Sequence, residues 1–335
     1  MSGKLTFGYL YDFRNPPQWR RPWDTFYSET LDVVAWTEEA GFAGAWVPEH
    51  HMAEDGYMPS PLVALTAMAA RTKRMKIGSA IALAPLYHPT RFAEDCAVLD
   101  IISGGRLEMG LAIGYRQREM AAFGVDFRKR GRIFDEWLQI VTRLWAGETV
   151  DFQGQHFDVK GARLMPPPTR GGIPIYIGGF TEKAMERVAL YGDGYVGSPE
   201  VCDLYAEKLG ERGKAPGDAK VRITDLFTVV AHDCEQAMDE LAPYFHHVNN
   251  SYSQWIHEDN AHGMDESMKP MTLDAYKKSG SLQILSPDAA IAKYKAMQER
   301  IPLDHVILMK PPGLPATRFV HYAQIFAKEV MPAFA

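Results

Sequence analysis

Short apolar runs alternate with longer amphipathic segments along most of the chain. Runs of this length, rich in β-branched and aromatic residues and bounded by Gly, Pro or polar residues, predict strands. The predicted strands are 5–11, 44–48, 76–83, 106–114, 173–179, 194–198, 221–231 and 304–310. Because nearly all are separated by helical segments, the pattern predicts a (β/α)8 TIM barrel, with a doubly wound sheet as the alternative.

The amphipathic segments predict helices with recognisable ends. Asp24 is placed to cap the first helix and Gly41 to end it. Pro61 stands in the first turn of a helix over 60–72. Further helices are predicted over 90–102, over 181–191, in the segment that ends at Trp145, and at the end of the chain.

Two segments interrupt the alternation. Residues 149–172 follow the fourth predicted strand and look like a small hairpin with a proline-rich loop. Residues 244–285 follow the seventh predicted strand and are too long for a simple connector, so we expect a lid-like insertion that helps to cover the active site. Both are taken as parts of one barrel domain over 1–335.

If the chain forms a barrel, the position of a residue bears on its function, because active sites of such barrels lie where the strands end. Gly178 and Gly179 end the fifth predicted strand, and Thr181 stands where the next helix begins. Glycines let a ligand approach the backbone, and a helix start offers unpaired N–H groups with a positive dipole. The segment therefore suits an anion such as phosphate, and a tight turn with Thr181 as an ordinary N-cap is the equal alternative.

The stretch WVPEHH (46–51) ends the second predicted strand with a carboxylate and two adjacent histidines. These residues could bind a metal, transfer a proton or simply form part of a loop. Adjacent residues at a strand end point apart, so a shared metal is disfavoured. We expect His50 to face the barrel mouth, with Glu49 or His51 as its support, and we expect no metal.

Composition and charge narrow the partners. A net charge of -6 and a pI near 6.0 argue against nucleic acid or an anionic membrane as partner. No apolar stretch approaches the roughly 20 residues of a membrane span, and the N-terminus shows no signal peptide. The three cysteines are far apart in the sequence and fit reduced thiols. A cytoplasmic enzyme is the expectation.

Several motifs occur in one order along the chain. They are EHH, the stretch GSAIALAPLYHPTRFAEDCAVLDIISGGRLEMGLAIGY (78–115), GGFTEKA followed by YGDGYVGS, a hairpin after LWAGE, and the ending EVMPAF. Together they resemble the bacterial luciferase-like family of flavin-dependent monooxygenases over nearly the whole chain. The resemblance implies a barrel that binds flavin mononucleotide (FMN) at its C-terminal face. Reduced flavin then reacts with O₂ to a C4a-hydroperoxide, which oxygenates an organic substrate.

The resemblance also implies roles for particular residues. Gly179, Phe180 and Thr181, with Gly178 before them, fall where the family holds the flavin phosphate. Ala80 and Ile81 fall beside the isoalloxazine ring, where the family often has a non-prolyl cis peptide. His50 matches the histidine assigned as acid/base. Apart from the resemblance, Tyr115 and Glu119 lie in the loop after the fourth predicted strand and are candidates to contact the flavin or a proton donor.

One position departs from the family. Ile113 stands where luciferase has an arginine that contacts the phosphate. The nearby Arg116 is the candidate to make that contact instead.

The resemblance leaves the cofactor and the partners open. The main hypothesis is a monooxygenase that receives reduced FMN, supplied by a separate flavin reductase, and acts with O₂ on a small, apolar organic substrate. The deazaflavin F420 is the alternative cofactor on the same barrel. A metal-dependent barrel hydrolase and a non-catalytic flavin-binding protein are less favoured alternatives. A homodimer or a larger homo-oligomer is expected from the family.

Overall fold

The computed structural model describes residues 4–259 and 269–335. Its centre is a closed barrel of eight strands in the order β1-β12-β9-β8-β7-β4-β3-β2, with every neighbouring pair parallel. The barrel strands are β1 (Thr6–Leu10), β2 (Gly44–Val47), β3 (Lys76–Leu83), β4 (Leu107–Ala112), β7 (Ile175–Ile177), β8 (Gly194–Gly197), β9 (Val221–Thr224) and β12 (Leu303–Met309). The predicted (β/α)8 barrel is confirmed.

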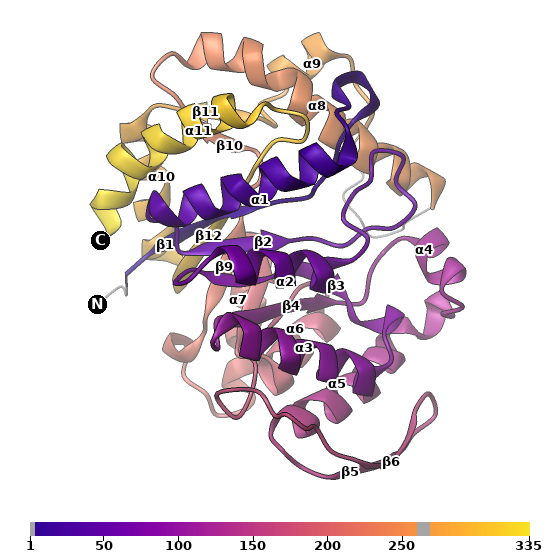
Figure 1. Cartoon of the computed structure of the whole chain (residues 1–335). Coiled ribbons are helices and arrows are strands. Elements are labelled where there is room, and N and C mark those ends of the chain that lie inside the picture. The colour runs from indigo at the N-terminus through magenta and orange to yellow at the C-terminus, as the bar shows by residue number, and fades with distance from the viewer. Residues whose placement is uncertain (1–3, 260–268) are drawn as a thin grey trace.

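Helices surround the barrel, as Figure 1 shows. They are α1 (Trp23–Glu39), α2 (Pro61–Arg71), α3 (Pro89–Ser103), α4 (Gln117–Ala122), α5 (Arg130–Trp145), α6 (Glu182–Tyr191), α7 (Cys202–Gly210), α8 (Cys234–Glu258), α9 (Leu273–Lys278), α10 (Pro287–Arg300) and α11 (Ala316–Ile325). Buried apolar side chains of strands and helices form one continuous core. Within the described ranges, no helix is long and apolar enough to cross a membrane.

Glycines in the barrel strands make room for a tryptophan. A Cβ on Gly78 would lie 1.9 Å from the Glu108 carbonyl oxygen and 2.6 Å from the Trp46 ring. A Cβ on Gly44 would lie 2.8 Å from Trp46 Nε1. Neither contact is possible for a real side chain, so small residues on neighbouring strands let the buried Trp46 occupy the barrel interior.

Two local predictions are wrong. The run 221–231 is not one strand: β9 ends at Thr224, and a separate β10 (Thr228–Val230) pairs with β11 (Gln283–Leu285) outside the barrel. The backbone leaves the barrel at Asp225, whose carboxylate pairs with Lys293 and receives the Tyr294 hydroxyl. A polar side chain held by α10 thus interrupts an apolar run.

The start of α1 also differs from the prediction. Asp24 does not cap this helix, because the N-cap position is Pro22 and Asp24 lies inside the first turn. A carboxylate there still interacts favourably with the helix dipole.

The two interrupting segments have their own structure. An antiparallel hairpin of β5 (Val150–Gln153) and β6 (Asp158–Ala162) lies within 149–172 and projects away from the barrel in Figure 1. The carboxylate of Glu136 accepts backbone N–H groups from 155, 156 and 157 and so ties the turn to α5. The segment 244–285 contains the second half of α8, then α9 and β11.

Candidate active site

The His50 ring lies just past β2 in a cage of aromatic side chains. Its centroid lies 4.8 Å from Tyr57, 5.5 Å from Tyr115, 5.9 Å from Tyr252 and 5.2 Å from Trp255. Tyr57 belongs to the segment between β2 and α2, Tyr115 follows β4, and the other two belong to α8. His50 is only 7% exposed, so the barrel end and α8 together give it an apolar, nearly dry surrounding.

Glu119 on α4 is the partner of His50. Its Oε1 atom lies 3.0 Å from His50 Nδ1 and accepts the backbone N–H of His51 at 2.8 Å. The Arg116 guanidinium donates to the same oxygen at 3.0 Å and to the carbonyl of His51 at 3.2 Å. The expectation that Glu49 or His51 would support His50 is therefore wrong: the carboxylate comes from α4, which the barrel closure brings beside β2.

Electrostatics keep Glu119 ionised. Burial by itself raises the pKa of this carboxyl, but the hydrogen bond and charge of His50, the His51 amide and Arg116 outweigh burial, so the pKa lies below its ordinary value. A carboxylate can only accept, so His50 Nδ1 carries a proton and His50 Nε2 remains for a ligand.

Glu49 serves the second histidine and the end of β3. Its Oε1 lies 2.9 Å from His51 Nε2 and accepts the Tyr87 hydroxyl at 2.6 Å, while Oε2 accepts the Leu83 N–H at 2.6 Å. The adjacent histidines thus have different carboxylates, as their alternation at a strand end predicts. No group of three or more His, Cys, Asp or Glu side chains suited to a metal occurs among the described residues. His262 of the insertion lies outside the described residues.

The Ala80–Ile81 peptide bond is cis, at the position where the resemblance places the flavin ring. The pairing of β3 with β4 shifts register between Ser79 and Ala82, so these two residues interrupt the regular ladder. Across the barrel mouth, a Cβ on Gly178 would lie 2.2 Å from Ile81 Cδ1. The structure therefore brings together the ends of β3 and β7, where the resemblance implies ring and phosphate contacts.

Gly179, Phe180 and Thr181 lead from β7 into α6. Gly179 has φ +145°, and a Cβ there would lie 2.7 Å from the Ala184 side chain. Thr181 is the N-cap of α6, and its hydroxyl accepts the Ala184 N–H at 3.3 Å. Phe180 is exposed. Thr181 is thus an N-cap, as one interpretation expected, and the same helix start keeps the dipole and backbone that suit a phosphate.

Buried polar atoms without a partner gather around His50. Among the described residues, the Tyr115 hydroxyl, Glu119 Oε2 and Arg14 Nη1 are buried and make no hydrogen bond. Such atoms are rare in folded proteins because each costs roughly 1–3 kcal/mol, and they mark places where water or a ligand completes the bonding. Polar atoms of this kind beside an aromatic cage fit the polar edge of a flavin ring.

Arg116 is not placed to contact phosphate. Its side chain is 1% exposed, and its guanidinium lies 3.4 Å from Asp259 and 4.3 Å from the Trp255 ring centroid. Together with its bond to Glu119, these contacts make Arg116 a support of the His50 site.

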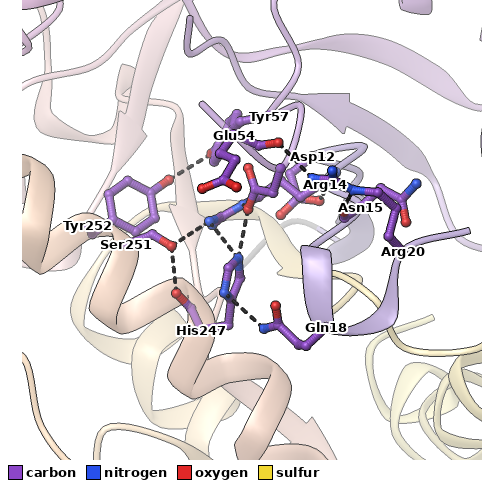
Figure 2. A network of polar contacts seen from close by, with 11 residues as sticks. Asp12, Arg14, Asn15, Gln18, Arg20, Glu54, Tyr57, His247, Ser251 and Tyr252 are labelled. Atoms are coloured by element: carbon purple, nitrogen blue, oxygen red, sulfur yellow. Dashed lines mark hydrogen bonds and ion pairs between the residues drawn. The ribbon is translucent and has the colours of Figure 1, made fainter. Parts of the chain in front are cut away.

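A second buried arginine, Arg14, holds α8 over this site (Figure 2). Its role was not predicted from the sequence. Arg14 Nε donates to Asp55 at 2.6 Å, and Nη2 donates to the Ser251 hydroxyl at 2.6 Å. His247 lies 2.7 Å from the same Asp55 oxygen, and the Tyr57 and Tyr252 hydroxyls are 2.7 Å apart. The position of Arg14 just past β1 was the only available signal, since its partners are distant in sequence.

Comparisons with known proteins show the family to which the chain is similar. A family model described as luciferase-like monooxygenase matches residues 5–302. An F420-dependent glucose-6-phosphate dehydrogenase of Amycolatopsis mediterranei is 25% identical over 91% of this chain and 93% of its own. The alkanal monooxygenase alpha chain of the Kryptophanaron alfredi symbiont is 28% identical over 64% of this chain and 63% of its own. The chain spans less than two thirds of the length of two curated relatives, at 58% and 63%.

A solved structure shares the fold over the full length. The monooxygenase RslO1 from Streptomyces bottropensis superimposes with a TM-score of 0.80, covering 99% of this chain and 100% of its own at 22% identity. At that identity the likeness shows the barrel fold alone.

Proposed function

Because the chain belongs to the luciferase-like monooxygenase family, we propose that it is a flavin-dependent monooxygenase acting with reduced FMN and O₂ on a small, apolar organic substrate. The single observation that carries the proposal is His50, paired with an ionised Glu119 and enclosed by four aromatic rings. A histidine in such a setting can transfer a proton while water is largely excluded.

The chain's own residues have separate tasks in this proposal. Gly178, Gly179, Phe180 and Thr181 hold the phosphate at the start of α6, and Ala80, Ile81 and Tyr115 contact the ring. Reduced flavin, when bound, supplies the electrons that activate O₂, and one oxygen atom goes to the substrate. His50 Nε2 transfers the proton, and Glu119 holds the ring through Nδ1 and stabilises its charged form. The aromatic cage keeps out water.

F420 is the second candidate cofactor. One relative in the comparison is named as an F420-dependent dehydrogenase and matches over most of both chains. On that alternative, His50 would serve hydride transfer without oxygen. Both cofactors need a ring site and a phosphate site, so the same barrel end suits either one.

A spectroscopic titration distinguishes the cofactors. We expect purified protein to change the absorbance of added FMN saturably and to leave that of F420 nearly unchanged. Reduced FMN with O₂ should then be consumed with product formation from candidate substrates, whereas reduced F420 under anaerobic conditions should not be oxidised. Tight binding and turnover of F420 instead would replace the FMN proposal. FMN binding that never couples to product would favour a non-catalytic flavin-binding protein.

Replacement of His50 tests the catalytic role. His50→Ala should keep FMN affinity within a few fold but lower product formation by about 10²-fold, the usual size of a general acid/base contribution. His88→Ala is the control, since His88 also follows a barrel strand but is exposed before α3. Unchanged coupling of FMN oxidation to product in His50→Ala would remove this residue from the mechanism.

The remaining partners follow from the same proposal. We propose O₂ and a separate flavin reductase as partners, because no dinucleotide-binding fingerprint is evident: residues 192–197 match G-x-G-x-x-G, but they follow α6 and include β8 instead of leading from a strand into a helix. A homodimer or larger homo-oligomer is part of the proposal, and light scattering of the purified protein measures it.

A further inference from the structure

The barrel has a second polar centre at the opposite end from His50. A cavity of about 460 Å³ opens there, within the size range of small-molecule sites. It is lined by residues that begin the strands: Thr6 of β1, Lys76 of β3, Glu108 of β4, Arg222 of β9, and Asp304 and His305 of β12. The candidate active-site residues described above lie in or beyond the C-terminal halves of the strands, so this cavity is separate from them.

Arg222 is the central cation of this cavity. Its guanidinium carbon lies 3.4 Å from the Tyr176 ring centroid and 4.9 Å from that of Trp46. Its Nη2 pairs with Glu108 at 2.6 Å, and its Nε lies 4.0 Å from Asp304 Oδ2, beyond hydrogen-bond distance. The side chain is 8% exposed, and within the described part of the chain Nε has no hydrogen-bond partner. A stacked, buried guanidinium therefore keeps a free donor.

Asp304 supplies a free acceptor beside it. Its Oδ1 is buried and makes no hydrogen bond to any described residue, and burial raises the pKa of this carboxyl despite the nearby Arg222. Leaving both a donor and an acceptor unpaired in one place costs roughly 1–3 kcal/mol each. A ligand that offers an acceptor and a donor together would satisfy both.

The other charges of the cavity are already paired. Glu108 binds Lys76 at 3.1 Å in addition to Arg222. Glu38 accepts the backbone N–H groups of 73, 74 and 75. Three cations, Arg74, Lys76 and Arg222, therefore face three carboxylates, those of Glu38, Glu108 and Asp304. The formal charge of the lining is zero, which favours a ligand without net charge.

His305 adds no charge to this balance. The Trp46 indole donates to His305 Nε2 at 2.9 Å, so the ring proton lies on Nδ1, 2.8 Å from the Thr6 hydroxyl. Burial and then the charge of Arg222 hold the pKa of His305 well below its ordinary value. The histidine is a fixed, neutral part of the wall.

We propose that this cavity binds a small zwitterion of the amino-acid type. The carboxylate of the ligand accepts from Arg222 Nε, its ammonium group donates to Asp304 Oδ1, and its apolar side chain lies against the cavity residues Phe42, Trp46 and Met75. A simple anion would leave Asp304 unpaired, and a simple amine would leave Arg222 unpaired. The site is independent of the proposed oxygenase function.

The test compares three probes that differ only in their charged groups. Calorimetric titration of the full-length protein with L-leucine should show saturable binding. 4-Methylpentanoate lacks the amine and isoamylamine lacks the carboxylate, so both should bind at least tenfold more weakly, a loss of about 1.4 kcal/mol. Equal binding of either single-charge probe, or no saturable binding of L-leucine, overturns the proposal.

Variants locate the binding. Arg222→Lys, Arg222→Met and Asp304→Asn should each weaken L-leucine binding about tenfold. Arg143→Met is the matched control, because Arg143 also pairs with a carboxylate, that of Glu148, but is partly exposed on α5 and does not line the cavity. Thermal unfolding checks that each variant is folded. Undiminished binding in folded Arg222→Lys and Asp304→Asn overturns the proposal, while FMN titration of the same variants reports separately on the opposite barrel end.

Discussion

The two ends of the barrel contain similar ionic groups in opposite surroundings. At the C-terminal end, Glu119 is held by His50 and Arg116. At the N-terminal end, Glu108 is held by Lys76 and Arg222. Each carboxylate is buried and has two cationic or ionisable partners, but the first group is enclosed by aromatic rings and the second faces an open cavity.

The covering, more than the charges, makes the two ends different. Trp255 and Tyr252 of α8 close over His50, and the Arg14 network holds that helix in place (Figure 2). The opposite end opens instead into the cavity lined by Glu108 and Arg222. An ionic group shielded from water suits chemistry, because its interactions are stronger and side reactions are fewer. An ionic group beside an open cavity suits reversible binding of a polar molecule.

Removal of Glu108 should have the largest effect on stability. Glu108→Ala leaves Arg222 buried without its main partner, so we expect the free energy of unfolding to fall by about 3 kcal/mol. Urea denaturation measures it. The double variant Glu108→Leu/Arg222→Met removes both charges and should recover most of that loss. A single-variant loss under about 1 kcal/mol would show that water solvates this end well enough to replace the pair.

The free energy of unfolding should depend on pH through Asp12, which follows β1 at the C-terminal end of the barrel. Burial, partly offset by Arg14, raises the pKa of Asp12 from 3.8 to about 6. Between these values the folded chain binds a proton that the unfolded chain does not, so stability falls as pH rises from about 4 to 6 and stays reduced above 6. Asp12→Asn should therefore raise the free energy of unfolding by about 2 kcal/mol at pH 7.5 and change it little at pH 4. Equal effects at both pH values would contradict this assignment.

Glu119→Gln tests the enclosed pair through activity. The amide can still accept a hydrogen bond but carries no charge to stabilise protonated His50, so we expect product formation to fall about tenfold with FMN affinity unchanged. A shift in the pH profile of activity should accompany it, which a purely structural role would not produce. Glu94→Gln is the control, since Glu94 makes only an exposed ion pair with Arg91 on α3. If Glu119→Gln keeps the wild-type rate and pH profile, the charge of Glu119 does not assist His50.

The smallest expected effect concerns the start of α6. Thr181→Glu places a negative charge beside the proposed phosphate and should weaken FMN binding about fivefold, a repulsion of about 1 kcal/mol in a hydrated setting. Riboflavin, which lacks the phosphate, should bind equally to variant and wild type. Thr272 caps α9 with the same 3.3 Å bond to a backbone N–H, so Thr272→Glu is the matched control. If the variant weakens both flavins equally, the phosphate lies elsewhere.

The sequence by itself determined the barrel and predicted a candidate site at its C-terminal end. Strand and helix periodicities are local properties, so eight apolar runs separated by helices could be recognised one at a time. The position of His50 at a strand end, and its separation in role from His51, followed from the alternation of a strand. The same local reasoning failed at 221–231, where Asp225 turns the chain out of the barrel because α10 holds its carboxylate.

Only the tertiary structure decided which residues complete the two centres. Glu119 lies 69 positions from His50 and becomes its partner because α4 follows β4 at the same barrel mouth. Arg14 meets Ser251 of α8 across 237 positions, and Arg222 meets Glu108 across the barrel interior. These pairs depend on barrel closure and on the packing of α8, and no pattern within a short window carries that information. The position of His50 was predicted from the sequence. Its partner Glu119, its aromatic cage and the second polar cavity became apparent only in the tertiary structure.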